Sequence, residues 1–223
     1  MKYKNIVKGK FISRPNRFIA KVTIDGAEHT VHVKNTGRCK ELLAPGAEIY
    51  LEYSDNPARK TAYDLIAVQK GERLINMDSQ APNTAFVEWA QEHYPGAVIR
   101  RETTYKDSRF DCYIEHGEDR IFTEVKGVTL ENAGHVRFPD APTERGIKHI
   151  NGLIDAVKNG YKAQVFFVIQ MEDVHSFSPN YETHPRFGRA LKNARDAGVD
   201  ILAYSCKITP DSMTIDKTVP VIL

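Results

Sequence analysis

Residues 108–127, SRFDCYIEHGEDRIFTEVKG, are the segment on which the rest of the predicted fold depends. Residues 108–115 and 120–127 each have the length and composition of a short strand. Gly117 and the two acidic residues after it supply the turn that joins them. Three apolar residues of the first strand alternate with other side chains and are expected on one face: Phe110, Cys112 and Ile114. The segment therefore predicts a β-hairpin.

Three side chains of this hairpin are candidates for a catalytic site. Side chains two positions apart on a strand point to the same face, so Glu124 and Lys126 share a face. The hairpin can bring Asp111 beside them. An Asp followed after twelve residues by Glu-Val-Lys is the spacing of a hydrolytic metal site of the PD-(D/E)XK type.

This combination suits phosphodiester cleavage, which develops negative charge on the attacking, phosphoryl and leaving oxygens. Carboxylates hold Mg²⁺ while leaving several of its waters in place. The metal lowers the pKa of a bound water, and a nearby ammonium stabilises the developing anion. We expect Asp111 and Glu124 to be the ligands of Mg²⁺ or Mn²⁺, and Lys126 to be the catalytic cation.

A different interpretation of the same residues is that Glu124 and Lys126 form a solvated pair, since Glu-x-Lys is common on exposed strands. The sequence that follows favours the catalytic interpretation. A loop rich in proline and glycine, a long helix and a strongly apolar strand come after the hairpin, and this order supplies the scaffold that such a site needs.

Composition limits the class of protein. With 223 residues, of which 41% are hydrophobic, the chain is large enough for one large or two small domains with packed cores. Its three cysteines are widely spaced and form no Cys-x-x-Cys pair, which argues against a disulfide framework or a structural zinc. No apolar run has the length of a signal peptide or a membrane span. We therefore expect a cytoplasmic protein without a membrane partner.

Positive charge is concentrated near the start of the chain. The whole chain has a net charge of +2, yet residues 1–40 contain 10 Lys/Arg and only 2 Asp/Glu. Such a segment either binds a polyanion or is simply a solvated basic surface. Under the first interpretation the partner is nucleic acid, and the phosphate-binding residues are Lys10, Arg14, Arg17, Lys34, Arg38 and Lys40. Phe11 and Phe18 either stack on bases or belong to the core.

Residues 1–80 are predicted to form a five-stranded barrel of the oligonucleotide-binding (OB) kind. Short strands separated by turn residues, among them the hairpin signal Asp25-Gly26, support this. Strands are expected near 8–14, 18–24, 29–33, 48–53, 61–69 and 73–76, with one helical turn near 35–43.

Residues 81–223 are predicted to form a mixed α/β domain in which helices flank a sheet. A helix capped by Asn83 is expected to reach His93, and Glu88 on it is either a solvated side chain or an additional metal ligand. Thr143 is expected to cap the start of a second helix, with Ile147, Ile150, Ile154 and Val157 as its apolar stripe. Arg145, Lys148 and His149 then lie on a polar face that is either solvated or binds phosphate. A long loop over 131–142 and a last strand over 200–205 complete the domain.

Motifs spread over most of the chain carry a family resemblance. They are NRF (16–18), NTGR (35–38), ELL (41–43), PG (45–46), SRFD (108–111), EVK (124–126), VTL (128–130), FPDAPT (138–143), RG (145–146) and KH (148–149). Together they resemble the sugar fermentation stimulation protein A (SfsA) family. The resemblance implies an N-terminal OB-like barrel, a C-terminal PD-(D/E)XK nuclease-like domain and DNA binding with little sequence preference. Lys34 stands where the family usually has a proline two residues after a histidine.

The sequence leaves three functions open. The first is a metal-dependent nuclease with Asp111, Glu124 and Lys126 as catalytic residues. The second is a non-catalytic, sequence-nonspecific DNA-binding regulator of sugar (maltose-type) metabolism genes on a nuclease scaffold. The third is a small-molecule binder with an incidental basic surface. The complete set of two acids and a lysine favours the first. The oligomeric state is open as well, a homodimer included.

Overall fold

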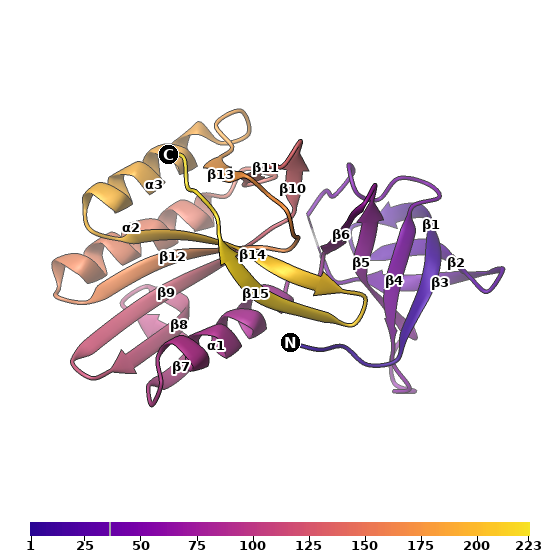
Figure 1. Cartoon of the computed structure of the whole chain (residues 1–223), viewed down its shortest axis with the longest axis horizontal. Coiled ribbons are helices and arrows are strands. Elements are labelled where there is room, and N and C mark those ends of the chain that lie inside the picture. Colours follow the sequence, from indigo (N-terminus) through magenta and orange to yellow (C-terminus); the bar gives the residue numbers. More distant parts are fainter. Residues whose placement is uncertain (36) are drawn as a thin grey trace.

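The computed structural model describes residues 1–35 and 37–223. It contains a β-barrel at one end and a mixed sheet flanked by helices at the other (Figure 1). The predicted fold class is therefore confirmed. Thr36, part of the predicted helical turn and of the NTGR motif, lies outside the described residues.

The barrel is closed by five strands. Their order in the sheet is β3-β2-β1-β4-β5, and a parallel pairing of β3 with β5 closes it. Asp25 and Gly26 both have positive φ, which is the conformation that a tight two-residue hairpin requires. A sixth strand pairs with β5 beyond the closure. The strands are β1 (Ile6–Asn16), β2 (Ile19–Ile24), β3 (Ala27–Val33), β4 (Glu48–Tyr53), β5 (Tyr63–Lys70) and β6 (Arg73–Asn76).

The second sheet has the order β15-β14-β12-β9-β8-β7. The two central pairings, β9–β12 and β12–β14, are parallel, and the outer ones are antiparallel. Strand β12 is buried almost throughout, as a strand covered on both faces should be. The strands are β7 (Val98–Tyr105), β8 (Ser108–His116), β9 (Asp119–Val128), β12 (Lys162–Ile169), β14 (Asp200–Thr209) and β15 (Ser212–Thr218).

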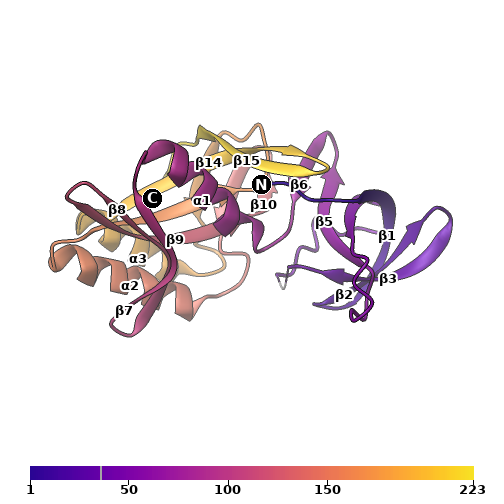
Figure 2. The same cartoon turned by 90° about the horizontal axis from the view of Figure 1, so that it is seen from below.

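Three helices cover the two faces of this sheet. Helices α2 (Glu144–Lys158) and α3 (Pro185–Asp196) lie on one face and α1 (Ala81–His93) lies on the other (Figure 2). Each face has its own core. Phe86 and Trp89 of α1 belong to one cluster of buried side chains, and Ile150 and Leu153 of α2 belong to another. The sheet is thus the middle layer of three.

The structure corrects three predictions about the helix starts, strands and loops of this domain. The expected loop over 131–142 contains a hairpin of β10 (Leu130–Asn132) and β11 (His135–Phe138), and β11 pairs with β13 (Ser176–Pro179). The strand at 200–205 is not the last, because β15 follows it. Helix α1 begins at Ala81, so Asn83 lies inside the helix and does not cap it. The predicted cap of α2 is confirmed, since the Thr143 hydroxyl accepts the Gly146 N–H at 3.1 Å.

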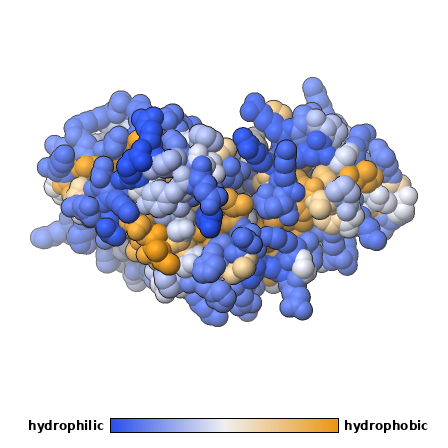
Figure 3. Space-filling model, turned by 90° about the horizontal axis from the view of Figure 1, so that it is seen from above, coloured by the Kyte–Doolittle hydropathy of each residue, from blue (hydrophilic) through white to orange (hydrophobic). Residues whose placement is uncertain are grey.

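The face in Figure 3 is largely hydrophilic, and its apolar areas are small and interrupted. Within residues 1–35 and 37–223, no helix has both the length and the apolar character needed to cross a membrane.

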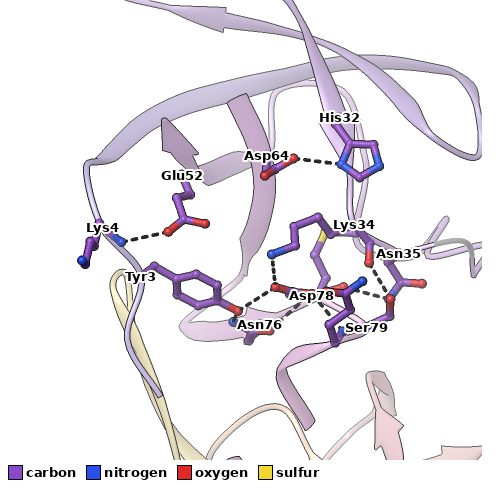
Figure 4. A network of polar contacts seen from close by, with 12 residues as sticks. Tyr3, Lys4, His32, Lys34, Asn35, Glu52, Asp64, Asn76, Asp78 and Ser79 are labelled. Carbon is purple, nitrogen blue, oxygen red and sulfur yellow. Dashed lines mark hydrogen bonds and ion pairs between the residues drawn. The ribbon is translucent and has the colours of Figure 1, made fainter. Parts of the chain in front are cut away.

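A buried polar network joins the barrel to the α/β domain. Asp78 has a side chain that is only 2% exposed, and one of its carboxylate oxygens lies 2.6 Å from the Lys34 ammonium at the end of β3 (Figure 4). Tyr3 and the backbone N–H of Gln80 also donate to this carboxylate. Gln170, which follows β12, donates to the Asp78 carbonyl oxygen at 3.0 Å. The segment between the domains is therefore held from both sides.

Replacing Lys34 by methionine is expected to destabilise the protein by about 3 kcal/mol, because Asp78 would remain buried without its cation. This is the lower end for such a change, since Tyr3 and Gln80 still donate to the carboxylate. Chemical denaturation measures the free energy of unfolding. Lys8→Met is the control, because Lys8 pairs with Glu48 at an exposed position and should matter little. Equal effects of the two substitutions would contradict the role given to Lys34.

Candidate active site

Asp111 interrupts the regular pairing of strand β8. The ladder between β8 and β9 ends at Cys112. One residue further on, the Asp111 Oδ2 atom accepts the backbone N–H of Val125 at 2.8 Å. Beyond this point the side chains change sides: Phe110 packs in the core under α2, whereas Cys112 and Ile114 pack under α1. The prediction that these three apolar residues share a face was therefore wrong, and the change of side occurs at the candidate ligand.

Glu124 lies beneath helix α2, with a side chain that is 2% exposed. Its Oε1 atom forms an ion pair with the Lys126 ammonium, two residues along the same strand. The His149 Nδ1–H of α2 donates to the same oxygen at 2.5 Å. On the other side of the imidazole ring, the Arg145 Nε–H lies 3.4 Å from His149 Nε2. The carboxylate is thus held by one cation and one imidazole.

The pKa values of the Asp111 and Glu124 carboxyl groups are shifted in opposite directions. Burial raises the pKa of Asp111, and the neighbouring charge of Glu124 raises it further. Burial would also raise the pKa of Glu124, but the hydrogen bonds from His149 and Lys126 outweigh it and hold the pKa below its ordinary value. The surroundings therefore favour the ionised form of Glu124 and disfavour that of Asp111. Like-charge repulsion between two close acids is typical of functional sites.

These groups line one polar cavity of about 280 Å³, which we call the carboxylate cavity. The cavity lies between the start of α1, strand β9 and the start of α2. Gly127 forms part of its wall, and a Cβ atom there would come within 2.5 Å of Gln170 Oε1 and 2.7 Å of Pro82 Cγ. Only glycine lets strand β9 pass this close. The lining residues are Ser79, Pro82, Asn83, Asp111, Glu124, Val125, Lys126, Gly127, Thr143, Arg145, Gly146 and His149.

The donor set fits a hard divalent cation. The Glu124 Oε2 atom is buried and has no hydrogen-bond partner, which is costly for a carboxylate oxygen unless a ligand completes it. The Asp111 oxygens accept one N–H each, from Asn83 and Val125, and keep lone pairs free. In the described part of the chain, no group of three or more His, Cys, Asp or Glu side chains is arranged to hold a metal. Two carboxylates suit Mg²⁺, which keeps several of its waters.

The structure separates the two basic residues predicted on α2. Arg145 is exposed at the rim of the carboxylate cavity. Lys148 points elsewhere, because its ammonium lies 2.9 Å from the Asp107 carbonyl oxygen in the turn between β7 and β8. Glu88, considered above as an additional ligand, pairs with the N-terminal amine of Met1 and does not line the cavity.

The predicted phosphate-binding residues of the barrel differ in whether their charged groups already contact other protein groups. Lys10, Arg17, Arg38 and Lys40 are exposed. Arg14 is half-buried, and its guanidinium donates to four backbone carbonyl oxygens, among them those of Asn35 and Gly37. Lys34 is paired with buried Asp78. Arg14 and Lys34 therefore have structural contacts that a phosphate would have to compete with.

Sequence reasoning missed two residues that shape the site. Asn83, assigned to a cap, donates from its amide to Asp111 Oδ1 at 3.1 Å. His149, assigned to a polar face, is buried against Glu124. The buried stripe of α2 is Gly146, His149, Ile150, Leu153 and Ala156, one position away from the predicted stripe. Choosing the stripe that includes a small residue at 146 would have placed His149 on the inner face.

Two protein-family models match consecutive parts of the chain. The "SfsA N-terminal OB domain" matches residues 12–77, and the "Sugar fermentation stimulation protein RE domain" matches residues 80–212. The chain belongs to the sugar fermentation stimulation protein family. The resemblance predicted from the motifs is confirmed.

SfsA relatives match over nearly their full length. A homologue from Desulfitobacterium hafniense is 58% identical over 96% of this chain and 94% of that protein. One from Clostridium beijerinckii is 57% identical over the whole of both chains. Among solved structures, the SfsA of Pyrococcus furiosus in complex with Ca²⁺ is 27% identical, with a TM-score of 0.89 over 100% of this chain and 98% of that one.

Asp111→Asn is expected to raise the free energy of unfolding of the metal-free protein at pH 7. The folded-state pKa of Asp111 lies above its unfolded value, so ionising the carboxyl group at neutral pH costs folding free energy. Asparagine removes this cost. The advantage should disappear as the pH falls below about 4, where the carboxyl group is protonated in both states. Urea denaturation with chelator at several pH values measures it.

The matched control is Asp107→Asn, which changes an acid that is 80% exposed in the turn before β8. It should give no comparable gain at pH 7. An Asp111→Asn variant less stable than the wild type at pH 7 would show that Asp111 is an ordinary structural carboxylate.

Proposed function

We propose that this SfsA protein is a DNA-binding, metal-dependent phosphodiesterase whose site consists of Asp111, Glu124 and Lys126. The observation that carries the proposal is the state of Glu124. Its Oε1 atom is held by Lys126 and His149, while its Oε2 atom is buried in the wall of a polar cavity without a partner. A carboxylate kept ionised and incompletely bonded in this way suits cation binding better than it suits stability.

Asp111 and Glu124 would hold Mg²⁺ or Mn²⁺. When bound, such an ion neutralises charge on the phosphoryl group and lowers the pKa of a bound water. Asn83 and the Val125 N–H orient the Asp111 carboxylate, and His149 orients Glu124. Each ligand thus has a supporting hydrogen bond of the kind that fixes metal ligands.

Lys126 would act on the phosphate and the attacking water. With a cation in place, its ammonium no longer has to neutralise Glu124 alone and becomes available to a phosphoryl oxygen or to the water. Arg145 at the rim adds a second positive charge where the scissile phosphate would enter. Both groups stabilise negative charge as it develops.

The solved relative supports a divalent cation. The Pyrococcus furiosus SfsA structure is described as a complex with Ca²⁺. Calcium and magnesium both prefer oxygen ligands, and calcium takes more of them at longer distances. By similarity, we infer that the carboxylate cavity of this chain is the cation site, with Mg²⁺ or Mn²⁺ as the catalytic ion.

The basic barrel supports DNA as the partner. Its exposed cations can neutralise phosphates without reading bases, which gives salt-sensitive binding with little sequence preference.

Cys39, Cys112 and Cys206 are all free thiols, which suits a reducing compartment. We therefore infer a cytoplasmic protein that acts on nucleic acid.

A second candidate function is a non-catalytic DNA-binding regulator of sugar (maltose-type) metabolism genes. The ion pair between Lys126 and Glu124 favours it, because a lysine already bound to the acid partly neutralises the cluster without a metal. In this alternative the carboxylate cavity is an inherited scaffold, and the barrel alone provides the activity.

Nuclease assays distinguish the two functions. Single- and double-stranded DNA and RNA are incubated with the protein in Mg²⁺, Mn²⁺ or chelator. Cleavage is expected only with metal, and Asp111→Asn and Lys126→Met should each lower its rate at least about 100-fold. Lys158→Met, which removes an exposed lysine at the far end of α2, is the control and should leave the rate unchanged.

Salt-sensitive binding without cleavage in any metal, unchanged by both site substitutions, would favour the regulator. Cleavage that survives in Asp111→Asn would contradict the assignment of the site, because a contaminating nuclease or another part of the chain would then be responsible.

A further inference from the structure

A second cavity lies on the barrel and adjoins the carboxylate cavity. Its volume is about 280 Å³, and Ser79 lines both cavities. We call it the barrel subsite. Its lining residues are Phe18, His32, Val33, Lys34, Arg59, Asp64, Ser79 and Gln80. Ser79 therefore lies at the boundary between the two cavities.

The barrel subsite lies where OB barrels bind extended chains. Phe18 comes from the turn between β1 and β2, and Arg59 comes from the loop between β4 and β5. His32 lies near the end of β3, beside Asp64 of β5. Barrels of this topology use the β2–β3 face and these two loops to bind oligonucleotides. The position thus favours a polymer strand over a buried small molecule.

Phe18 provides an exposed aromatic ring beside the polar side chains of the barrel subsite. Its side chain is 44% exposed, in contrast to Phe11, which is 3% exposed in the core. The Arg17 guanidinium lies 4.7 Å from the centre of the Phe18 ring. An exposed aromatic ring with an adjacent cation suits a nucleotide, because the base stacks on the ring and the phosphate lies near the cation.

His32 is held in one orientation by a buried carboxylate. Its Nδ1 atom lies 2.8 Å from Asp64 Oδ1 (Figure 4). Arg59 donates two hydrogen bonds to the same carboxylate. Burial would raise the pKa of Asp64, but the hydrogen bonds from Arg59 and His32 outweigh it and keep the pKa below its usual range. An ionised Asp64 requires His32 to donate from Nδ1, which leaves Nε2 available for a ligand.

We propose that the barrel subsite binds one nucleotide of an unpaired strand, next to the phosphate that enters the carboxylate cavity. The base stacks on Phe18, and His32 Nε2 forms a hydrogen bond with the nucleotide. The exposed Arg17 neutralises a phosphate. This inference rests on the proposed nucleic-acid function and names its substrate class, which is single-stranded DNA or a duplex with a frayed end.

Stacking on Phe18 explains the preference for unpaired strands. In a duplex the faces of each base are covered by its neighbours, so a protein ring can stack only on a base that has left the helix. The exposed barrel cations contact phosphates of either form. Duplex binding should therefore depend on the cations alone, and single-strand binding on the cations and Phe18 together.

Fluorescence anisotropy in chelator tests the proposal without cleavage. The probes are a labelled oligothymidylate of about 12 nucleotides, within the site size of one barrel, and a duplex of the same length. Phe18→Ala is expected to weaken single-strand binding on the order of 10-fold, and His32→Ala about 5-fold, with duplex binding unchanged. The slope of log affinity against log salt should stay the same in Phe18→Ala, because no phosphate contact is lost.

The control is Tyr181→Ala, which removes another exposed ring with an adjacent cation, Lys192, from the α/β domain. It should bind both probes like the wild type. Wild-type affinity of Phe18→Ala and His32→Ala for the single strand would overturn the subsite, and metal-dependent cleavage by the same preparations would show that the proposed function stands. A wild-type protein that neither binds nor cleaves any probe would overturn both.

Discussion

The contact between the Asp111 carboxylate and the Val125 N–H is the interaction on which the candidate site depends. The regular pairing of β8 with β9 ends just before this contact. The Val125 N–H of β9 therefore donates to the side chain of Asp111 and not to a backbone carbonyl oxygen of β8. This brings Asp111 close enough to Glu124 for the Glu124 charge to raise the pKa of Asp111. The hydrogen bond from Asn83 then ties the same carboxylate to helix α1, and His149 ties Glu124 to helix α2. Two acids are thereby fixed from both faces of the sheet.

Fixing two acids in this way works against folding stability. A carboxylic acid with a raised pKa and a buried oxygen without a partner are both unfavourable in the metal-free protein. Lys126 and His149 offset part of this cost at Glu124 Oε1, and nothing described in the structure does so at Oε2. A bound cation would stabilise the ionised Asp111 and give Glu124 Oε2 a partner. Cation binding would therefore increase the stability of the folded protein. The segment through Asp78, hydrogen-bonded to both domains, holds the barrel beside this site.

Much of the architecture could be predicted because its signals are local. The Asp25-Gly26 turn, the Thr143 cap and the central hairpin each follow from a few neighbouring residues. The misses need information from distant parts of the chain. The β10–β11 hairpin is stabilised by pairing with β13, about forty residues later in the chain. The role of Asn83 depends on its hydrogen bond to Asp111, which lies on another element. His149 shows the limit of periodicity, since a shift of one position moves a helix residue from solvent to the core.

A crystal of the protein soaked in Mn²⁺ gives the most direct test of this account, because the anomalous scattering of manganese locates the ion without any assumption about activity. We expect an anomalous peak in contact with both the Asp111 carboxylate and Glu124 Oε2, with the Lys126 ammonium moved away from Glu124. The absence of a peak between these carboxylates at saturating Mn²⁺, with Lys126 still paired to Glu124, would contradict it.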